Sequence, residues 1–266
     1  MQNEKLNLCL VPMEIFWGDK EKNLNTLKEI FPMIHPATDL VILPETFSTG
    51  FPTKQNKEQI RAYAEKNTGP TIDYLKGLSE RYSVAIAGSF IADSGGLLFN
   101  RAFFIEPSGD EYFADKRHLF SPGGENDIFS NGSERLNARF RGWNISMIIC
   151  YDLRFPVWCR NRENEYDLLI AVANWPVNRI NVWDSLLMAR AMENSSYVCG
   201  VNCKGIDSSG YEYNGSSMVF DPKGKNLTVS ISEDGLLYAT LSKSKLENYR
   251  HKFPAWMDAD KFEIID

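Results

Sequence analysis

Short apolar runs alternate with amphipathic stretches along the chain. The runs at residues 6–11, 39–43, 84–88, 101–105, 145–150, 168–172 and 197–203 have the length and the apolar content of buried strands. Residues 20–34, 71–81 and 179–194 lie between or beside these runs and carry apolar side chains at helical spacing. Strands that alternate with helices indicate an α/β layered fold.

Turn residues refine this picture. Pro107-Ser-Gly-Asp110 and Asp221-Pro-Lys-Gly224 each separate two apolar runs and are predicted to close hairpins, so the sheets are expected to be mixed. The chain shows no internal repeat and no linker-like tract, which predicts a single domain over residues 1–266. The tail, about 242–266, is expected to form no regular element by itself and to lie across the body or a partner subunit.

Charge and cysteine usage narrow the functional classes. The chain has 29 basic and 35 acidic residues, a net charge of -6, which argues against a nucleic acid partner. Neither a membrane-length apolar run nor a secretory leader is apparent, so no membrane partner and a cytoplasmic location are expected. The five cysteines are odd in number and favour a reduced compartment. The spacing of Cys199 and Cys203 falls in a predicted strand and does not predict a zinc site.

Reactive side chains follow three of the predicted strands. Glu45 comes after an apolar strand and Pro44, Lys116 follows residues 112–115, and Cys150 follows residues 146–149. A thiol between a strand and a helix start gains from the helix dipole and from a nearby cation, which would lower its pKa. Each residue also has a structural interpretation. Glu45 could be a capping carboxylate, Lys116 could belong to a solvated charge run, and Cys150 could be a buried core cysteine.

A cysteine and histidine pair is a further possibility. His118 is the most suitable of the three histidines to act as a base for Cys150, since His35 lies in a turn and His251 lies in the tail. A neutral histidine that hydrogen-bonds to the backbone remains the alternative.

The three strand ends together resemble the Glu-Lys-Cys triad of the nitrilase superfamily of carbon–nitrogen hydrolases. The similarity extends in order over nearly the whole chain, and the sequences of its motifs are closest to those of the bacterial omega-amidase-like branch. The motifs that carry it are Leu43-Pro-Glu-Thr-Phe-Ser-Thr-Gly-Phe51, Asp115-Lys-Arg-His-Leu-Phe120, Gly123-Gly-Glu125, Gly142-Trp143, Ile149-Cys-Tyr-Asp-Leu-Arg-Phe-Pro156, Ala173-Asn-Trp-Pro176, Ala189-Arg-Ala-Met-Glu-Asn194 and Gly215-Ser-Ser217.

The resemblance implies a fold and a mechanism. The fold is a four-layer α-β-β-α sandwich that pairs into a homodimer, with the tail at the subunit contact. In the mechanism Cys150 attacks an amide carbon, Glu45 transfers the protons, and Lys116 with the backbone N–H of Tyr151 stabilises the oxyanion. Glu125 matches a second glutamate that orients the nucleophile and the lysine, although it could simply balance the charge of Lys116. No cofactor and no metal are expected.

The implied substrate is a small-molecule amide, the omega-amide of a dicarboxylic acid such as 2-oxoglutaramate. Arg154 is the arginine best placed to bind the remote carboxylate of the substrate with its guanidinium group, unless it forms a salt bridge with Asp152 or Glu193. Trp175 and Phe47 could form walls of the pocket or belong to the core. Other substrates remain open, among them N-carbamoyl compounds, nitriles and aliphatic amides, as does a catalytically silent binding module on the same fold.

Overall fold

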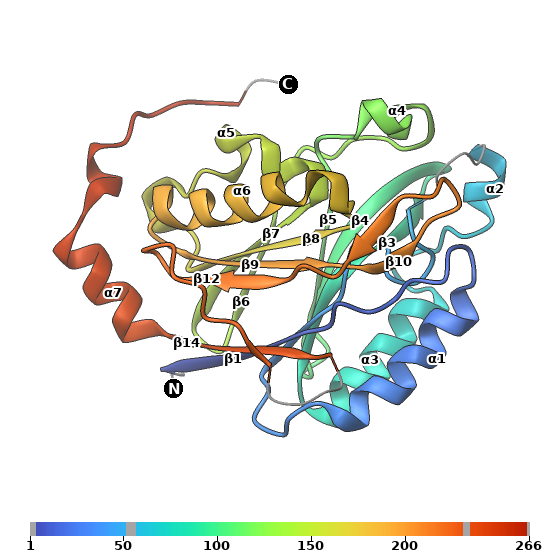
Figure 1. The fold of residues 1–266 in the computed structure, drawn as a ribbon, viewed down its shortest axis with the longest axis horizontal. Coiled ribbons are helices and arrows are strands. Elements are labelled where there is room, and N and C mark those ends of the chain that lie inside the picture. The colour runs from blue at the N-terminus through green and yellow to red at the C-terminus, as the bar shows by residue number, and fades with distance from the viewer. Residues whose placement is uncertain (1–3, 52–56, 231–234, 265–266) are drawn as a thin grey trace.

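Two β-sheets pack face to face in the computed structural model, which describes residues 4–51, 57–230 and 235–264 (Figure 1). Within these residues one sheet has seven strands, in the order β13 (Val229–Ser230), β14 (Leu237–Ser242), β1 (Lys5–Leu10), β2 (Leu40–Ile42), β3 (Ala85–Ser94), β4 (Leu97–Ile105) and β5 (Glu111–Asp115). The other has five strands, in the order β12 (Met218–Phe220), β9 (Tyr197–Asn202), β8 (Leu168–Ala173), β7 (Trp143–Ile149) and β6 (Leu136–Phe140). Strand pairs in both sheets are partly parallel and partly antiparallel, as expected.

Helices cover the outer face of each sheet (Figure 1). On the seven-stranded sheet these are α1 (Lys20–Ile30) and α3 (Pro70–Tyr82), and on the five-stranded sheet α5 (Pro156–Cys159) and α6 (Ile180–Glu193). Two further short helices are α2 (Lys57–Arg61) and α4 (Glu125–Ile128). The prediction of a four-layer α-β-β-α sandwich is therefore confirmed.

The central core lies between the two sheets. Alternate residues of β1, such as Leu6 and Leu8, and of β7, such as Ile145 and Met147, belong to one buried cluster. The intervening residue Cys9 faces the helical layer instead. This alternation follows from the two-residue period of a strand, and it fixes which end of each strand reaches the junction of the sheets.

Both predicted hairpins are present, but the second is short. The turn at Pro107–Asp110 joins β4 to β5, which pair antiparallel. The turn at Asp221–Gly224 forms, with the Gly224 N–H donating to the Asp221 carbonyl at 2.9 Å, but it closes only an isolated bridge between Phe220 and Asn226. The Asp221 N–H donates to the Lys225 carbonyl and the Leu227 N–H to the Val219 carbonyl, so this hairpin is short, and the following strand β13 pairs with β14 in the other sheet.

The C-terminal segment also differs from the expectation, because α7 (Lys243–Lys252) is a regular helix. The Ser242 side chain caps it, accepting a hydrogen bond from the Lys245 N–H, and Leu246 is fully buried. Arg250 ties it to the buried Asp167 at 3.0 Å, a partner far away in sequence. Figure 1 shows α7 and the following segment at the end of the sandwich opposite α1 and α3; residues 265–266 lie outside the described residues.

In the described ranges, no helix is long and apolar enough to cross a membrane.

Candidate active site

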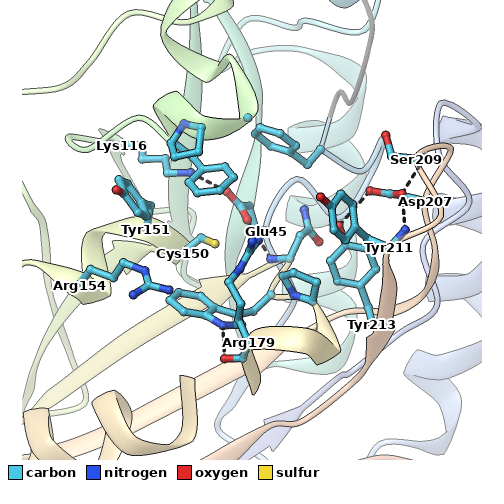
Figure 2. Close-up of a pocket in the computed structure, with 17 residues that line it drawn as sticks. Glu45, Lys116, Cys150, Tyr151, Arg154, Arg179, Asp207, Ser209, Tyr211 and Tyr213 are labelled. Atoms are coloured by element: carbon cyan, nitrogen blue, oxygen red, sulfur yellow. Dashed lines mark hydrogen bonds and ion pairs between the residues drawn. The ribbon is translucent and has the colours of Figure 1, made fainter. Parts of the chain in front are cut away.

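The three predicted strand ends meet at one cavity of about 320 Å³ (Figure 2). Glu45 follows β2, Lys116 follows β5 directly, and Cys150 follows β7. The first two residues come from the seven-stranded sheet and the third from the five-stranded sheet. The cavity therefore lies where the two sheets meet at one edge of the sandwich.

Lys116 lies between two carboxylates. Its Nζ is 3.0 Å from Glu45 Oε1 and 2.9 Å from Glu125 Oε2, and all three side chains are at most 1% exposed. Burial alone disfavours the ammonium, but Glu125 and Glu45 outweigh burial and raise the pKa of Lys116 above its usual value. Lys116 therefore stays charged and cannot serve as a base at neutral pH.

Glu45 is held at both oxygens. Oε1 accepts a hydrogen bond from Asn100 Nδ2 at 2.8 Å as well as from Lys116, and Oε2 accepts one from the Asn174 N–H at 2.8 Å. Asn174 follows β8 in the other sheet. Glu45 is thus oriented by donors from both sheets, of which one is a backbone N–H and two are side chains, so it is more than a capping carboxylate.

Glu125 lies behind Lys116 and does not line the cavity. Burial raises the pKa of its carboxyl, and the nearby Glu45 adds to this effect, while Lys116 opposes it. Its Oε2 accepts a hydrogen bond from the Phe120 N–H, which fixes the carboxylate relative to the loop after β5. The geometry thus places Glu125 against Lys116 rather than against Cys150.

Cys150 stands at the sharp turn between β7 and a short 3-10 helix, Cys150–Arg154. Its φ of 45° lies in the left-handed region, which a non-glycine residue adopts only when its surroundings enforce it. Asp152 supplies part of that enforcement: its carboxylate accepts hydrogen bonds from the Ile149 N–H at 3.0 Å and from the His118 N–H at 2.9 Å. Asp152 therefore links the turn of Cys150 to the segment that carries Lys116.

The expectation of a lowered thiol pKa was wrong. Burial raises the pKa of Cys150 well above its ordinary value, and the negative charge of Glu45 adds to this, while Lys116 only partly opposes it. A single 3-10 turn carries a smaller dipole than a long helix. The resting side chain is thus a neutral thiol, which needs a base to form the nucleophile.

His118 does not pair with Cys150. Its Nδ1 is 2.9 Å from Asp152 Oδ1, its ring stacks on Phe155 with centroids 3.7 Å apart, and it does not line the cavity. Glu45 is instead the cavity residue that faces the thiol as a potential base.

Three of the four predicted substrate-binding residues, Tyr151, Arg154 and Trp175, line the cavity. The Arg154 guanidinium lies 4.9 Å from the Trp175 ring centroid and forms no ion pair with a carboxylate of the described residues. Asp152 and Glu193, the alternative partners, are engaged elsewhere: Glu193 pairs with Arg190 at 2.9 Å. The salt-bridge interpretation of Arg154 is therefore not supported.

Phe47 is the exception, and its assignment to the pocket wall was wrong. It is fully buried, packs 5.9 Å from the Phe103 ring, and is absent from the cavity lining. Phe51, four residues later, lines the cavity instead. The chain turns sharply at Thr46, whose φ is 42°, so that Phe47 points into the core behind β3.

A carbon-nitrogen hydrolase family model matches residues 8–251. The chain belongs to this family. It is 37% identical over 260 residues to the omega-amidase YafV of Escherichia coli K12, covering 97% of this chain and 98% of the relative. It is 29% identical over 262 residues to the 2-oxoglutaramate amidase of Bacillus subtilis, covering 97% and 98%.

Solved structures agree with this membership. The carbon-nitrogen hydrolase XC1258 of Xanthomonas campestris, which carries an arsenic adduct in its active site, superposes with a TM-score of 0.92 at 36% identity, covering 98% of this chain and 100% of that one. Nit3 of Saccharomyces cerevisiae, a member of the nitrilase superfamily, shares the fold with a TM-score of 0.80 at 23% identity, covering 95% and 96%.

Other residues of this hydrolase's cavity were missed from the sequence. Arg179 directly precedes α6. Asp207, Ser209 and Tyr211 lie in the loop between β10 (Lys204–Ile206) and β11 (Glu212–Asn214), and Tyr213 lies in β11. Arg179 was detectable in principle, because β8 is another parallel strand whose carboxyl end reaches this edge. The loop residues carry no periodic signal. In the described residues no cluster of three or more histidine, cysteine, aspartate or glutamate side chains could hold a metal.

Proposed function

We propose that this carbon-nitrogen hydrolase is an omega-amidase, which hydrolyses the terminal amide of small dicarboxylic acid monoamides such as 2-oxoglutaramate to the acid and ammonia. One observation carries the proposal: a buried Cys150 beside the Glu45 and Lys116 pair shares its cavity with Arg154, whose charge no described carboxylate neutralises. The names of the full-length relatives from E. coli and B. subtilis support the same activity.

Acylation begins with proton transfer. Glu45 takes the proton of the Cys150 thiol as the sulfur attacks the amide carbon, which is required because the raised pKa keeps the thiol neutral at rest. The oxyanion that forms is stabilised by the Lys116 ammonium and the Tyr151 backbone N–H. Glu45 then gives its proton to the leaving ammonia, the carbon–nitrogen bond breaks, and an acyl thioester remains on Cys150.

Deacylation repeats the steps with water. Glu45 removes a proton from a water molecule that attacks the thioester, and the oxyanion again lies at Lys116. The carbon–sulfur bond then breaks to release the acid, and Glu45 returns the proton to the sulfur of Cys150. Glu125 acts by positioning Lys116 through its two short contacts. A preorganised cationic donor of this kind contributes roughly 3–4 kcal/mol to transition-state stabilisation.

Arg154 binds the remote carboxylate of the substrate. Its guanidinium rests on the Trp175 ring, which leaves the in-plane N–H groups free for a bidentate contact. Trp175 and Tyr151 then form apolar walls along the carbon chain of the substrate.

We propose in addition that the chain folds as one domain, forms a homodimer and acts in the cytoplasm. The family match over residues 8–251 supports one domain, and five free cysteines support a reducing compartment. The tail presents Phe253 and Met257, which are 59% and 66% exposed, and such apolar side chains favour a subunit contact.

Ammonia release from a panel of amides tests the activity. The panel contains 2-oxoglutaramate, succinamate, glutamine, an N-carbamoyl amino acid and an aliphatic nitrile, and Cys150→Ala is the blank. We expect turnover of the first two substrates that depends on Cys150. Preferential turnover of another member would contradict the omega-amidase assignment while retaining the cysteine mechanism, and turnover by the Cys150→Ala variant would contradict the mechanism itself.

A further inference from the structure

The cavity is lined by two arginines that pair with no carboxylate in the part of the chain that the structure describes. Of its charged lining residues, Glu45 and Lys116 pair with each other. The Asp207 carboxylate accepts hydrogen bonds from the Ser209 N–H at 2.8 Å, the Tyr211 N–H at 2.9 Å and the Tyr213 hydroxyl at 3.1 Å. Arg154 and Arg179 pair with no carboxylate of the described residues. The charged lining residues therefore sum to one net positive charge, and both guanidinium groups are available to a bound molecule.

Both arginines are supported by the same tryptophan. The Trp175 ring lies under the Arg154 guanidinium, and its Nε1–H donates to the Arg179 carbonyl at 2.9 Å. The Arg179 guanidinium lies 5.4 Å from the centroid of Phe120, another residue of the cavity wall. Figure 2 shows both side chains extending into the cavity that holds Cys150. Two guanidinium groups, each lying on an aromatic ring, can therefore donate hydrogen bonds to the same bound molecule.

We propose that Arg179 is a second substrate-binding residue, which donates hydrogen bonds to the 2-oxo oxygen next to the carboxylate that Arg154 binds, and which excludes an α-ammonium group at that position. The inference rests on the proposed omega-amidase function. A carbonyl oxygen accepts from a guanidinium, whereas an ammonium has only donors and meets two like charges. Asp207 keeps its negative charge, but hydrogen bonds from the Ser209 N–H, the Tyr211 N–H and the Tyr213 hydroxyl hold its carboxylate within its own loop (Figure 2). Arg179 would therefore select 2-oxo acid amides over the free amino acid amides.

The test compares kcat/KM for three substrates in the full-length Arg179→Met variant. For 2-oxoglutaramate we expect a fall of roughly 10- to 100-fold, as for the loss of a hydrogen bond from a charged donor. For glutaramate, the five-carbon monoamide that lacks only the oxo group, we expect a fall of less than about fivefold, and for glutamine no fall or a rise. Arg81→Met is the matched control, since the Arg81 guanidinium also lies on an aromatic ring, that of Tyr82 in α3, outside the cavity. It should leave all three values unchanged.

An equal fall for all three substrates would overturn the inference, because it would make Arg179 a support for the cavity shape. Unchanged values would overturn it as well. Should the methionine variant fail to fold, Arg179→Lys keeps the charge and decides the question: turnover of 2-oxoglutaramate should fall while glutamine stays excluded, and a parallel change in both would refute the role. Failure of the proposed function is seen separately, as absence of omega-amide turnover in the unaltered enzyme, and the inference falls with it.

Discussion

The floor and the rim of the cavity differ in how their charges are satisfied. The floor, defined as Glu45, Lys116 and Cys150 with Glu125 and Asn100 directly behind them, is almost fully enclosed, and each of its charges has a short contact to an opposite charge. The rim, defined as Arg154, Arg179, Asp207 and Tyr211, carries guanidinium groups that rest on aromatic rings and have no carboxylate partner among the described residues. The charges of the floor are therefore paired before the substrate binds, whereas the guanidinium groups of the rim obtain their partner from the substrate.

Glu45→Gln should have the largest effect, because it removes the base of the floor while keeping the side-chain shape. We expect kcat to fall by roughly 10²- to 10⁴-fold. The same change should lower the pKa of the Cys150 thiol: burial remains, but the negative charge that raises the pKa is gone. Ammonia release checks the first effect, and the pH profile of iodoacetamide alkylation at Cys150 checks the second. An alkylation profile that stayed in place or moved to higher pH would contradict this electrostatic role.

Arg154→Met should act on binding rather than on chemistry. Loss of a charged donor should raise KM for succinamate by roughly 10- to 100-fold, with a much smaller change in KM for a neutral aliphatic amide. Steady-state kinetics on both substrates measure this difference. If the two KM values rose together, Arg154 would be a structural residue of the rim, and the contrast with the floor would disappear.

His118→Asn should have a small effect, within about threefold in kcat/KM, because the asparagine amide can still donate to Asp152 and the ring lies outside the cavity. The measurement is the kinetics on 2-oxoglutaramate, with thermal unfolding as the control for folding. A loss of 100-fold or more in a folded variant would restore the hypothesis of a Cys150 and His118 pair.

Phe47→Leu should change activity least. The side chain belongs to the core behind the floor, so we expect the free energy of unfolding to fall by about 1 kcal/mol, with kcat and KM unchanged. Urea unfolding and kinetics on the same preparation test this. A raised KM at unchanged stability would show that Phe47 contacts the substrate after all.

The sequence predicted the floor better than the rim. Glu45 and Cys150 each follow an apolar strand directly or after two residues, so hydrophobic pattern and motif identified them together. Lys116 follows the partly exposed strand β5 in a charge run, and the motif alone identified it. Phe47 lies in the same motif as Glu45, but its direction depends on the positive φ of Thr46. The pattern of apolar residues does not predict that backbone angle.

The rim was harder because it is assembled from loops. Asp207 and Tyr211 belong to the region between β10 and β11, where side-chain direction depends on tertiary contacts rather than on a period. The helix α7 was missed for a similar reason: its polar sequence has a weak apolar face, and the ion pair of Arg250 with Asp167 supplies a contact that only the folded chain contains. The pattern of apolar residues also did not predict the strand order, since β12 belongs to the five-stranded sheet and β13, the next strand, pairs with β14 in the seven-stranded sheet.

Because the base and the nucleophile belong to different sheets, turnover depends on how the two sheets pack against each other. Glu45 follows a strand of one sheet and accepts its hydrogen bond from the Asn174 N–H of the other, on which Cys150 also resides. A partly unfolded form in which each sheet kept its strands but the two had slipped apart would retain its circular dichroism and lose all turnover. Catalysis would then report the first loosening of the sandwich, earlier in a denaturant series than any probe of secondary structure.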